Sequence, residues 1–140
     1  MASIVPNDTK KLLLDRLISG KTFKMSFHTS SFTPNKDTMT YKSDLTNEIT
    51  GGGYTAGGYT LDTVATAVDD TNDIAYVDAA DEVVATLTNT FRYAVICDTT
   101  TGVDSTSPIV AIIDYGADRS PYNASFTHQF ATDGWLKITE

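Results

Sequence analysis

Two apolar segments near the middle of the chain show the clearest pattern. Residues Phe91–Cys97 and Ile109–Ile113 carry apolar side chains at both odd and even positions. Successive side chains of a strand point to opposite faces, so strands of this kind are covered on both sides. The stretch between them, Asp98–Pro108, is rich in Asp, Ser, Thr and Gly, which favour turns. The pattern predicts a β-hairpin in the middle of the core, with a long solvated tip that buries nothing.

Shorter alternating segments predict further strands. In Thr22–His28 apolar residues alternate with polar ones, which places His28 on the polar face. The polar stretch Ser30–Tyr41 is expected to be a loop. Other strands are expected within residues 59–68, 74–77, 83–87, 125–130 and 135–138, the last two joined as a hairpin by Thr132–Gly134. Many short strands with turn residues between them predict an all-β sandwich, jelly-roll-like, in a single domain.

One short helix is expected before the strands. Its apolar stripe consists of Leu13, Leu14, Leu17 and Ile18, between a cap at Asn7 or Asp8 and a stop at Gly20. Because the stripe is short, a helix that packs against one end or face of the β domain is favoured over one that docks on a membrane surface or a partner. The chain is therefore divided into an N-terminal arm and helix at residues 1–20 and a β-sandwich domain at 21–140.

Composition and charge narrow the class of protein. The net charge is −8, with 15 Asp against 3 Glu, and 23 residues are Thr. Asp favours turns and Thr favours strands, so this composition fits a β protein with many loops. The acidic surface disfavours duplex nucleic acid as a partner.

No apolar run approaches the roughly 20 residues of a membrane span. The first residues lack the pattern of a signal peptide, which predicts a protein made in a cytoplasm and not exported by that route. The single Cys97 cannot form an intramolecular disulfide and is expected to act as a small hydrophobe.

The segment Gly51–Thr60 contains a doubled Gly-Gly-Tyr-Thr element. A phosphate-binding loop would lead into a helix and usually carry a Lys, and neither follows here. We therefore expect backbone at positive φ in close approach to its neighbours, with Tyr54 and Tyr59 packing nearby. The alternative is an exposed arm that grips a neighbouring subunit.

Several acidic residues and two histidines are candidates for metal-binding or catalytic roles. Asp69–Asp73 lacks the glycine and glutamate that an EF-hand loop needs at its sixth and twelfth positions, so a hairpin tip is favoured over a metal site. Asp78, Asp81 and Glu82 receive the same interpretation. His28 and His128 lie on polar strand faces without a nucleophile elbow, which disfavours a hydrolase. Paired carboxylates for glycoside cleavage are defined by their separation in space, so the many Asp residues give no specific signal for them. We expect no enzyme, and no catalytic, metal or cofactor-binding residues.

The order of segments carries a family resemblance. The landmarks are the helix Lys10–Ser19 followed by a strand and Thr33–Asp37, then Asn47–Ile49 before Gly53–Gly58, then Arg92–Ile96, and finally Ile113–Asp118 followed by Ala124–Thr127. In this order, from about Lys10 to Ile138, the chain resembles small virion structural proteins of tailed bacteriophages, described as head decoration, cement or minor structural proteins. Tyr76–Leu87 departs from the family pattern, because it is rich in alanine and lacks a tryptophan.

The resemblance implies a non-enzymatic, cofactor-free virion component that is assembled in the host cytoplasm. A capsid decoration or cement protein is the favoured role. Its partners would be the major capsid protein or another virion protein and further copies of the chain, not nucleic acid or a membrane. Contacts are expected in the N-terminal segment, the Ser30–Tyr41 loop, the glycine-rich segment and the hairpin tip, at Ile4, Val5, Phe32, Pro34, Tyr41, Gly53, Tyr54, Gly57, Tyr59 and Val103.

Two alternative functions stay open at this point. One is a virion protein of the neck, tail or fibre. The other is a carbohydrate-binding module that stacks sugars on the aromatic side chains of Tyr54, Tyr59, Tyr122 and Trp135.

Overall fold

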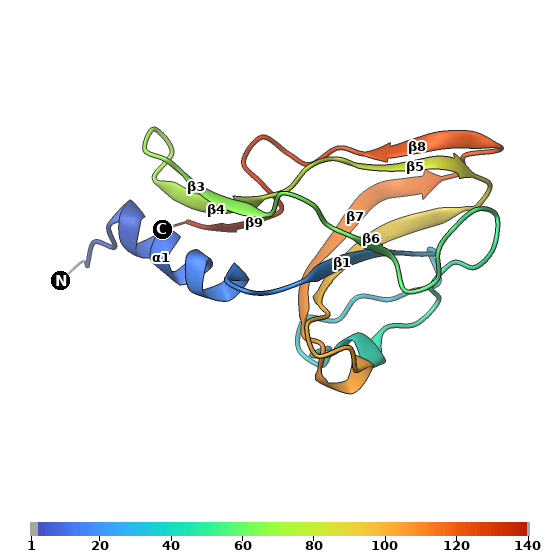
Figure 1. Ribbon diagram of the computed structural model, residues 1–140, viewed down its shortest axis with the longest axis horizontal. Helices are drawn as coiled ribbons and strands as arrows, with labels where there is room; N and C mark the ends of the chain where they lie inside the picture. The colour runs from blue at the N-terminus through green and yellow to red at the C-terminus, as the bar shows by residue number, and fades with distance from the viewer. Residues whose placement is uncertain (1–2, 140) are drawn as a thin grey trace. The chain divides into compact units, whose positions relative to one another are not determined.

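The computed structural model describes residues 3–139, which form one α-helix and nine strands in three sheets (Figure 1). The elements are α1 (Asn7–Ile18), β1 (Phe23–His28), β2 (Tyr59–Thr60), β3 (Ala65–Asp69), β4 (Ile74–Asp78), β5 (Glu82–Leu87), β6 (Phe91–Asp98), β7 (Ile109–Arg119), β8 (Ala124–His128) and β9 (Leu136–Ile138), with 3₁₀ turns at Lys42–Asp44 and Asp104–Thr106. The predicted all-β fold with one short N-terminal helix is confirmed. No helix among the described residues is long and apolar enough to cross a membrane.

The described chain divides into two compact units. The smaller unit contains residues 3–21, 62–81 and 129–139, and the larger contains Thr22–Leu61 and Glu82–His128. Helix α1 therefore belongs with strands that are distant from it in the sequence.

In the smaller unit, α1 packs on the antiparallel sheet β3-β4-β9. Leu14 of the helix lies in one buried cluster with Ala75 and Val77 of β4. Partly buried apolar residues surround this cluster: Ile18, Val64, Val68, Trp135, Leu136 and Ile138. The expectation that the helix covers one face of a β structure is confirmed.

The start of α1 differs from the prediction. Its N-cap is Pro6, whose carbonyl accepts the N–H groups of Thr9 and Lys10 at 3.0 and 3.1 Å. Asn7 lies inside the helix, and its side chain donates to Asp70 Oδ1 at 3.0 Å instead of capping the helix. The side-chain amide of Asn7 thus connects the first turn of α1 to the β3–β4 turn. Capping rules consider only neighbouring residues, so they do not predict this long-range hydrogen bond.

The apolar stripe predicted for α1 is also wrong. Leu13 and Leu17 are 52% and 38% exposed, whereas Lys10 and Leu14 are buried. Lys10 can occupy the buried face because its Nζ donates to Asp73 O at 2.7 Å and to Asn7 Oδ1 at 3.2 Å. The hydrogen bonds of its ammonium group thus allow Lys10 to be buried at a position that the hydrophobic pattern did not assign to the buried face.

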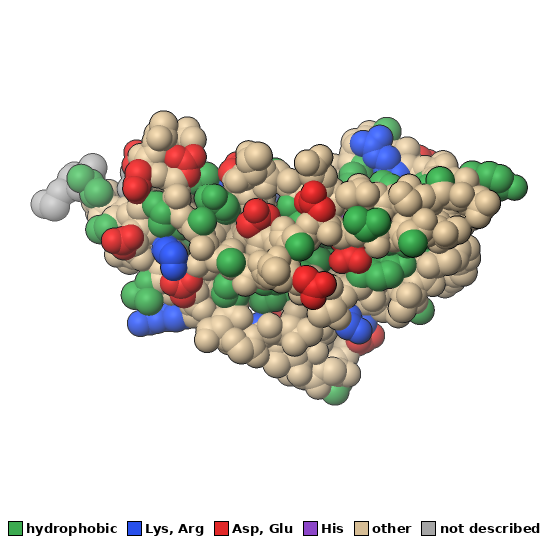
Figure 2. Space-filling view, turned by 45° about the horizontal axis from the view of Figure 1, so that its top comes forward, with side chains coloured by type: hydrophobic (Ala, Val, Ile, Leu, Met, Phe, Trp, Pro, Cys, Tyr) green, Lys and Arg blue, Asp and Glu red, His purple; other side chains and the backbone are tan. Residues whose placement is uncertain are grey.

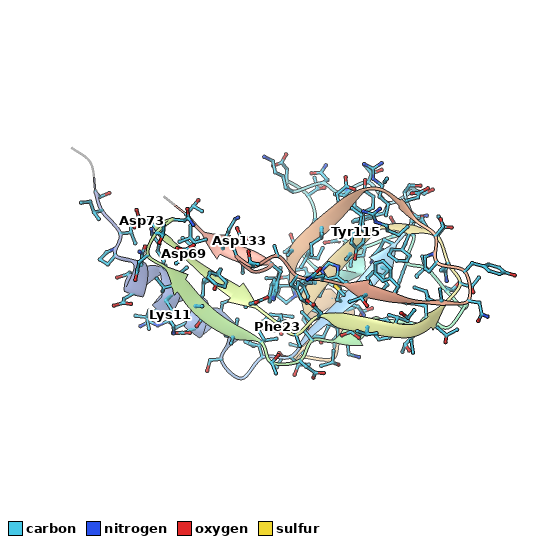
Figure 3. The ribbon with its side chains drawn as sticks, turned by 90° about the horizontal axis from the view of Figure 1, so that it is seen from above. Lys11, Phe23, Asp69, Asp73, Tyr115 and Asp133 are labelled. Atoms are coloured by element: carbon cyan, nitrogen blue, oxygen red, sulfur yellow. The ribbon has the colours of Figure 1, made fainter. Side chains whose placement is uncertain are left out.

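The Asp69–Asp73 segment forms the tip of the β3–β4 hairpin, as predicted (Figure 3). One carboxylate oxygen of Asp69 accepts the N–H groups of Thr71 and Asn72 at 2.9 and 3.2 Å. A hydrogen bond from the Asn72 side chain is the largest cause that lowers the pKa of Asp69, and the two backbone hydrogen bonds lower it further. The carboxylate therefore serves the turn itself.

The larger unit is built from two antiparallel sheets, β2-β1-β6-β7 and β5-β8. Figure 1 shows β5 and β8 as a second layer over the four-stranded sheet. Between the layers, the ring of Phe27 stacks on Phe91 with centroids 4.6 Å apart and meets Phe126 edge-on at 5.7 Å. This aromatic cluster is the core of a sandwich-like arrangement.

The predicted central hairpin is β6–β7, and its two strands differ in burial. Ala94, Val95, Ile96 and Cys97 of β6 are fully buried, in agreement with coverage on both faces. β7 is an edge strand, and its apolar residues are only half-buried. The tip is mostly exposed, but Asp98 and Ser107 are buried, so the expectation that the tip buries nothing is wrong at its two ends.

The two closing strands do not form the predicted hairpin. β8 pairs with β5, and β9 pairs with β4. The expected turn exists, since Gly134 N–H donates to Ala131 O at 2.9 Å, but it connects strands of different sheets. Trp135 N–H donates to Val77 O at 2.9 Å, which directs the chain onto β4. A long-range backbone bond of this kind cannot be read from turn residues.

Candidate functional site

The predicted contact residues fall into two groups. Ile4, Val5, Tyr41 and Val103 are exposed apolar side chains, and Pro34 and Gly53 are exposed as well. Gly57 and Tyr59 are half-buried, whereas Phe32 and Tyr54 are buried. The exposed members present surface to solvent, whereas the buried ones are part of the packed interior.

Phe32 shows how the Ser30–Tyr41 loop is held. The segment contains no strand, as predicted, yet Phe32 packs into a buried cluster with Val95 and Cys97. Its ring meets Tyr93 edge-on with centroids 5.5 Å apart. Phe32 is therefore the anchor of the loop and not a surface contact.

The glycine-rich segment is tightly packed against two strands. All its glycines have positive φ, namely Gly51, Gly52, Gly53, Gly57 and Gly58. A Cβ at Gly58 would lie 2.2 Å from the carbonyl oxygen of Met25 on β1, and one at Gly53 would lie 2.1 Å from that of Thr86 on β5. The predicted close approach at positive φ is confirmed.

Tyr54 fixes the same segment from the inside. Its hydroxyl donates to Glu48 Oε1 at 2.6 Å and accepts Phe27 N–H at 3.3 Å, while Gly57 N–H donates to the same Glu48 oxygen at 2.8 Å. Burial, followed by the neighbouring Glu48 carboxylate, raises the pKa of Tyr54. The predicted packing of both tyrosines is confirmed by their ring contact, with centroids 5.7 Å apart.

The burial of the aromatic side chains bears on the alternative of a carbohydrate-binding module. Tyr54 lies in the core, and Trp135 packs against the cluster around Leu14. Tyr122 alone of the four aromatic residues is strongly exposed, at 83%. A stacking platform needs ring faces open to solvent.

An apolar groove runs along the start of β7. It has a volume of about 320 Å³ and is lined by Asn35, Lys36 and Met39 of the loop and by Ile109, Val110, Ala111 and Ile112 of the strand. From Val110 to Arg119, β7 pairs only with β6 within residues 3–139. A free strand edge presents backbone N–H and C=O groups to a partner. The groove thus combines apolar side chains with an open strand edge.

The sequence identified one wall of this groove. The Ser30–Tyr41 loop was predicted to make contacts, but β7 was predicted to be covered on both faces. Period-2 patterning shows which faces of a strand are apolar, but it does not show whether the hydrogen-bonding edge has a neighbour. The edge position of β7 is therefore a feature of topology.

A second, polar pocket opens beside β1. Its volume is about 160 Å³, and it is lined by Ser26, His28, Lys42, Ser43, Leu45, Glu48 and Asp104. Ser26 and His28 lie on the polar face predicted for this strand, but they are only 3% and 1% exposed. The Lys42 ammonium is paired with Asp104, with Nζ and Oδ1 2.8 Å apart. The polar face of β1 is thus enclosed by loops instead of facing bulk solvent.

The hydrogen bonds of His28 define its tautomer. Nδ1 lies 2.7 Å from the carbonyl oxygen of Thr46, which can only accept, so Nδ1 carries the proton. Nε2 is then an acceptor in the neutral ring and receives the hydroxyl of Ser26 at 2.9 Å. Burial is the largest cause that lowers the pKa of His28, and it outweighs the opposing effects of the Thr46 carbonyl and the Glu48 carboxylate.

This lowered pKa predicts a pH dependence of stability. Above about pH 6.5, His28 is neutral in both folded and unfolded chains, and its contribution to stability is fully present. As the pH falls below that value, the unfolded chain binds a proton first, so the free energy of unfolding decreases towards the lower pKa of the folded state. We expect an NMR titration of the native protein to give His28 a pKa below 6.5. A value at or above 6.5 would contradict the burial argument.

Cys97 and His128 are two further buried groups. Burial raises the pKa of the Cys97 thiol to about 12, and its cluster with Phe32 and Val95 confirms the prediction of a small hydrophobe. His128, which the sequence placed on a polar strand face, is buried too. Its Nδ1 lies 2.5 Å from the hydroxyl of Tyr115, which projects from β7 (Figure 3). Each histidine thus has a hydroxyl partner that the sequence did not reveal.

Several acidic side chains accept hydrogen bonds from backbone N–H groups and so stabilise the fold. Asp78 Oδ1 accepts Ala79 N–H at 2.8 Å, and Asp81 Oδ1 accepts Phe130 N–H at 2.9 Å. Figure 2 shows carboxylates scattered among other side chains on the visible face. Within residues 3–139, no three His, Cys, Asp or Glu side chains are placed to hold one metal ion.

Comparison of the chain with protein-family models, with curated proteins and with solved structures gave no match.

Proposed function

We propose that this chain is a structural protein of a bacteriophage virion, which decorates or cements the head lattice through protein contacts. The order of sequence landmarks supports the virion class. The main structural support for binding through protein contacts is the apolar groove of about 320 Å³ beside the free edge of β7. The proposed partner is an extended segment of the major capsid protein, with further copies of the chain at neighbouring lattice positions.

The groove suits this partner in two ways. An extended segment can add to an open strand edge through backbone hydrogen bonds, while its side chains fill apolar pockets beside the edge. Ile109 and Ile112 pack on the buried cluster around Phe32, so these two side chains need little further ordering on binding. Many identical weak contacts around a lattice then give avidity.

The charge of the protein suits the same role. The net charge of −8 disfavours adhesion to packaged DNA. The fold needs no disulfide, which is compatible with assembly in the host cytoplasm. Exposed apolar side chains at Ile4, Val5 and Val103 are further candidate contacts, separate from the groove.

Mass spectrometry and gel densitometry of purified particles test the proposal. A decoration protein is expected in many copies per head, whereas a neck, tail or fibre protein is expected in few. The protein should also sediment with heads that lack it. Absence from particles together with no sedimentation would refute the virion role, and low copy number would move it from the head to the neck, tail or fibre.

A charge in the groove tests the contact surface. We expect Val110→Lys to weaken binding to heads at least about tenfold, because a lysine would leave a charge in an apolar interface. The matched control is Val83→Lys on β5, since Val83 is an exposed strand valine outside the groove. Co-sedimentation at several protein concentrations measures both. Equal binding by the two variants would exclude the groove as the contact.

A further inference from the structure

The polar pocket beside β1 contains an arrangement that the proposed structural role does not use. Ser26 Oγ lies 2.9 Å from Nε2 of His28, and both side chains line the same pocket. A second serine, Ser43, also lines this pocket. Ser26 is thus the pocket serine that is paired with an imidazole base.

The imidazole is held in the orientation that a general base requires. Nδ1–H of His28 donates a hydrogen bond to the Thr46 carbonyl, with Nδ1 and O 2.7 Å apart, so the lone pair of Nε2 points towards the Ser26 hydroxyl. The Phe32 ring packs beside the imidazole with centroids 5.1 Å apart. A hydroxyl, a base and an acceptor that orients the base form the chain of contacts that activates a serine nucleophile. Here a backbone carbonyl takes the orienting place.

From this geometry we propose that Ser26 is an activated nucleophile that accepts small acyl groups from esters entering the pocket. Ser26 Oγ attacks the ester carbonyl carbon while its proton passes to His28 Nε2. The bond to the leaving alcohol then breaks, and the alcohol takes that proton from the imidazole. The product is an acyl ester on Ser26, and water attacks it by the same proton path to release the carboxylic acid.

The pocket limits the class of acyl donor. A volume of about 160 Å³ and polar walls admit a short acyl group better than a long aliphatic one. Lys42 also lines the pocket, and its ammonium can stabilise the negative charge that develops on the carbonyl oxygen. Its pairing with Asp104 holds the ammonium in place. Small, polar acyl esters are therefore the expected donors.

Methanesulfonyl fluoride is a probe small enough for this pocket. Its sulfur forms a bond to Ser26 Oγ, fluoride leaves, and the serine proton passes through His28 to solvent. We expect peptide mass spectrometry of the folded wild-type protein to find one methanesulfonyl group on Ser26 and none on Ser43. In urea the selectivity for Ser26 should disappear, because His28 is no longer beside it. A folded protein without label on Ser26, or with Ser43 labelled as fast, would overturn the proposal.

Two variants and a pH series separate activation from mere accessibility. We expect His28→Gln to slow labelling of Ser26 roughly a hundredfold, as loss of a general base does, and Ser43→Ala to leave it unchanged. In the wild type, labelling should slow as acid protonates His28, whose charged pocket neighbours are Glu48, Lys42 and Asp104. A folded His28→Gln variant that labels at the wild-type rate would refute activation. If that variant does not fold, a wild-type rate that is independent of pH would refute it instead.

The inference is independent of the proposed virion role. The β7 groove and the β1 pocket share no lining residue, so capsid binding can fail while Ser26 is labelled, and the reverse.

Discussion

Gly58→Ala is expected to lower the free energy of unfolding by about 3 kcal/mol or more, or to prevent folding. Gly58 has φ +90°, and a Cβ there would lie 2.2 Å from Met25 O and 2.9 Å from Ser26 N. These atoms belong to the backbone of β1, which is hydrogen-bonded between β2 and β6 and cannot easily move. The strand or the glycine-rich segment must shift, and either change disrupts the sheet. Urea denaturation followed by circular dichroism measures the loss.

The adjacent glycine provides a matched control. Gly57 has φ +87°, but a Cβ at this position would meet no heavy atom within 4 Å. Gly57→Ala should therefore cost only the strain of a left-handed alanine, about 1–2 kcal/mol. The difference between the two variants isolates the contact with Met25 from the backbone strain. Equal losses would show that the segment does not press on β1 as described.

Phe27→Ala is expected to cost about 3–5 kcal/mol, because it empties the centre of the aromatic cluster. Phe27 is fully buried, and its ring contacts Phe91, Phe126, Tyr54 and Tyr59. The control is Tyr122→Ala, which removes an exposed ring and should change the free energy of unfolding by no more than about 0.5 kcal/mol. Both are measured by the same urea denaturation. A cost below about 1 kcal/mol for Phe27→Ala would contradict a core centred on this ring.

The features predicted well from the sequence are those with local causes. Alternation gave β1 its apolar face, and turn residues marked the tip between β3 and β4. The conformational freedom of glycine pointed to a close approach between Gly58 and its neighbours before any partner was known. Each of these follows from sterics or periodicity within a few residues.

The features that the sequence did not reveal depend on distant partners. Lys10 occupies a buried position on α1 because Asp73 O, far along the chain, accepts a hydrogen bond from its ammonium group. β8 and β9 separate because each finds a different strand to pair with.

The candidate sites divide in the same way. The loop wall of the apolar groove was predicted, but the open edge of β7 depends on the strand order. Ser26 and His28 were placed on one strand face, yet their enclosure depends on Thr46 and Phe32 from the following loops. Pairing and enclosure are three-dimensional facts that an alternating pattern leaves open.

The smaller unit is assembled from three separate stretches of chain, with passages between the units after residues 21, 61, 81 and 128. A single crossover within the gene cannot transfer this unit as a whole. Recombination between related genes would have to exchange nearly the entire coding sequence to keep Leu14 together with Val77 and Leu136. The smaller unit can therefore be exchanged between related genes only together with almost all of the larger one.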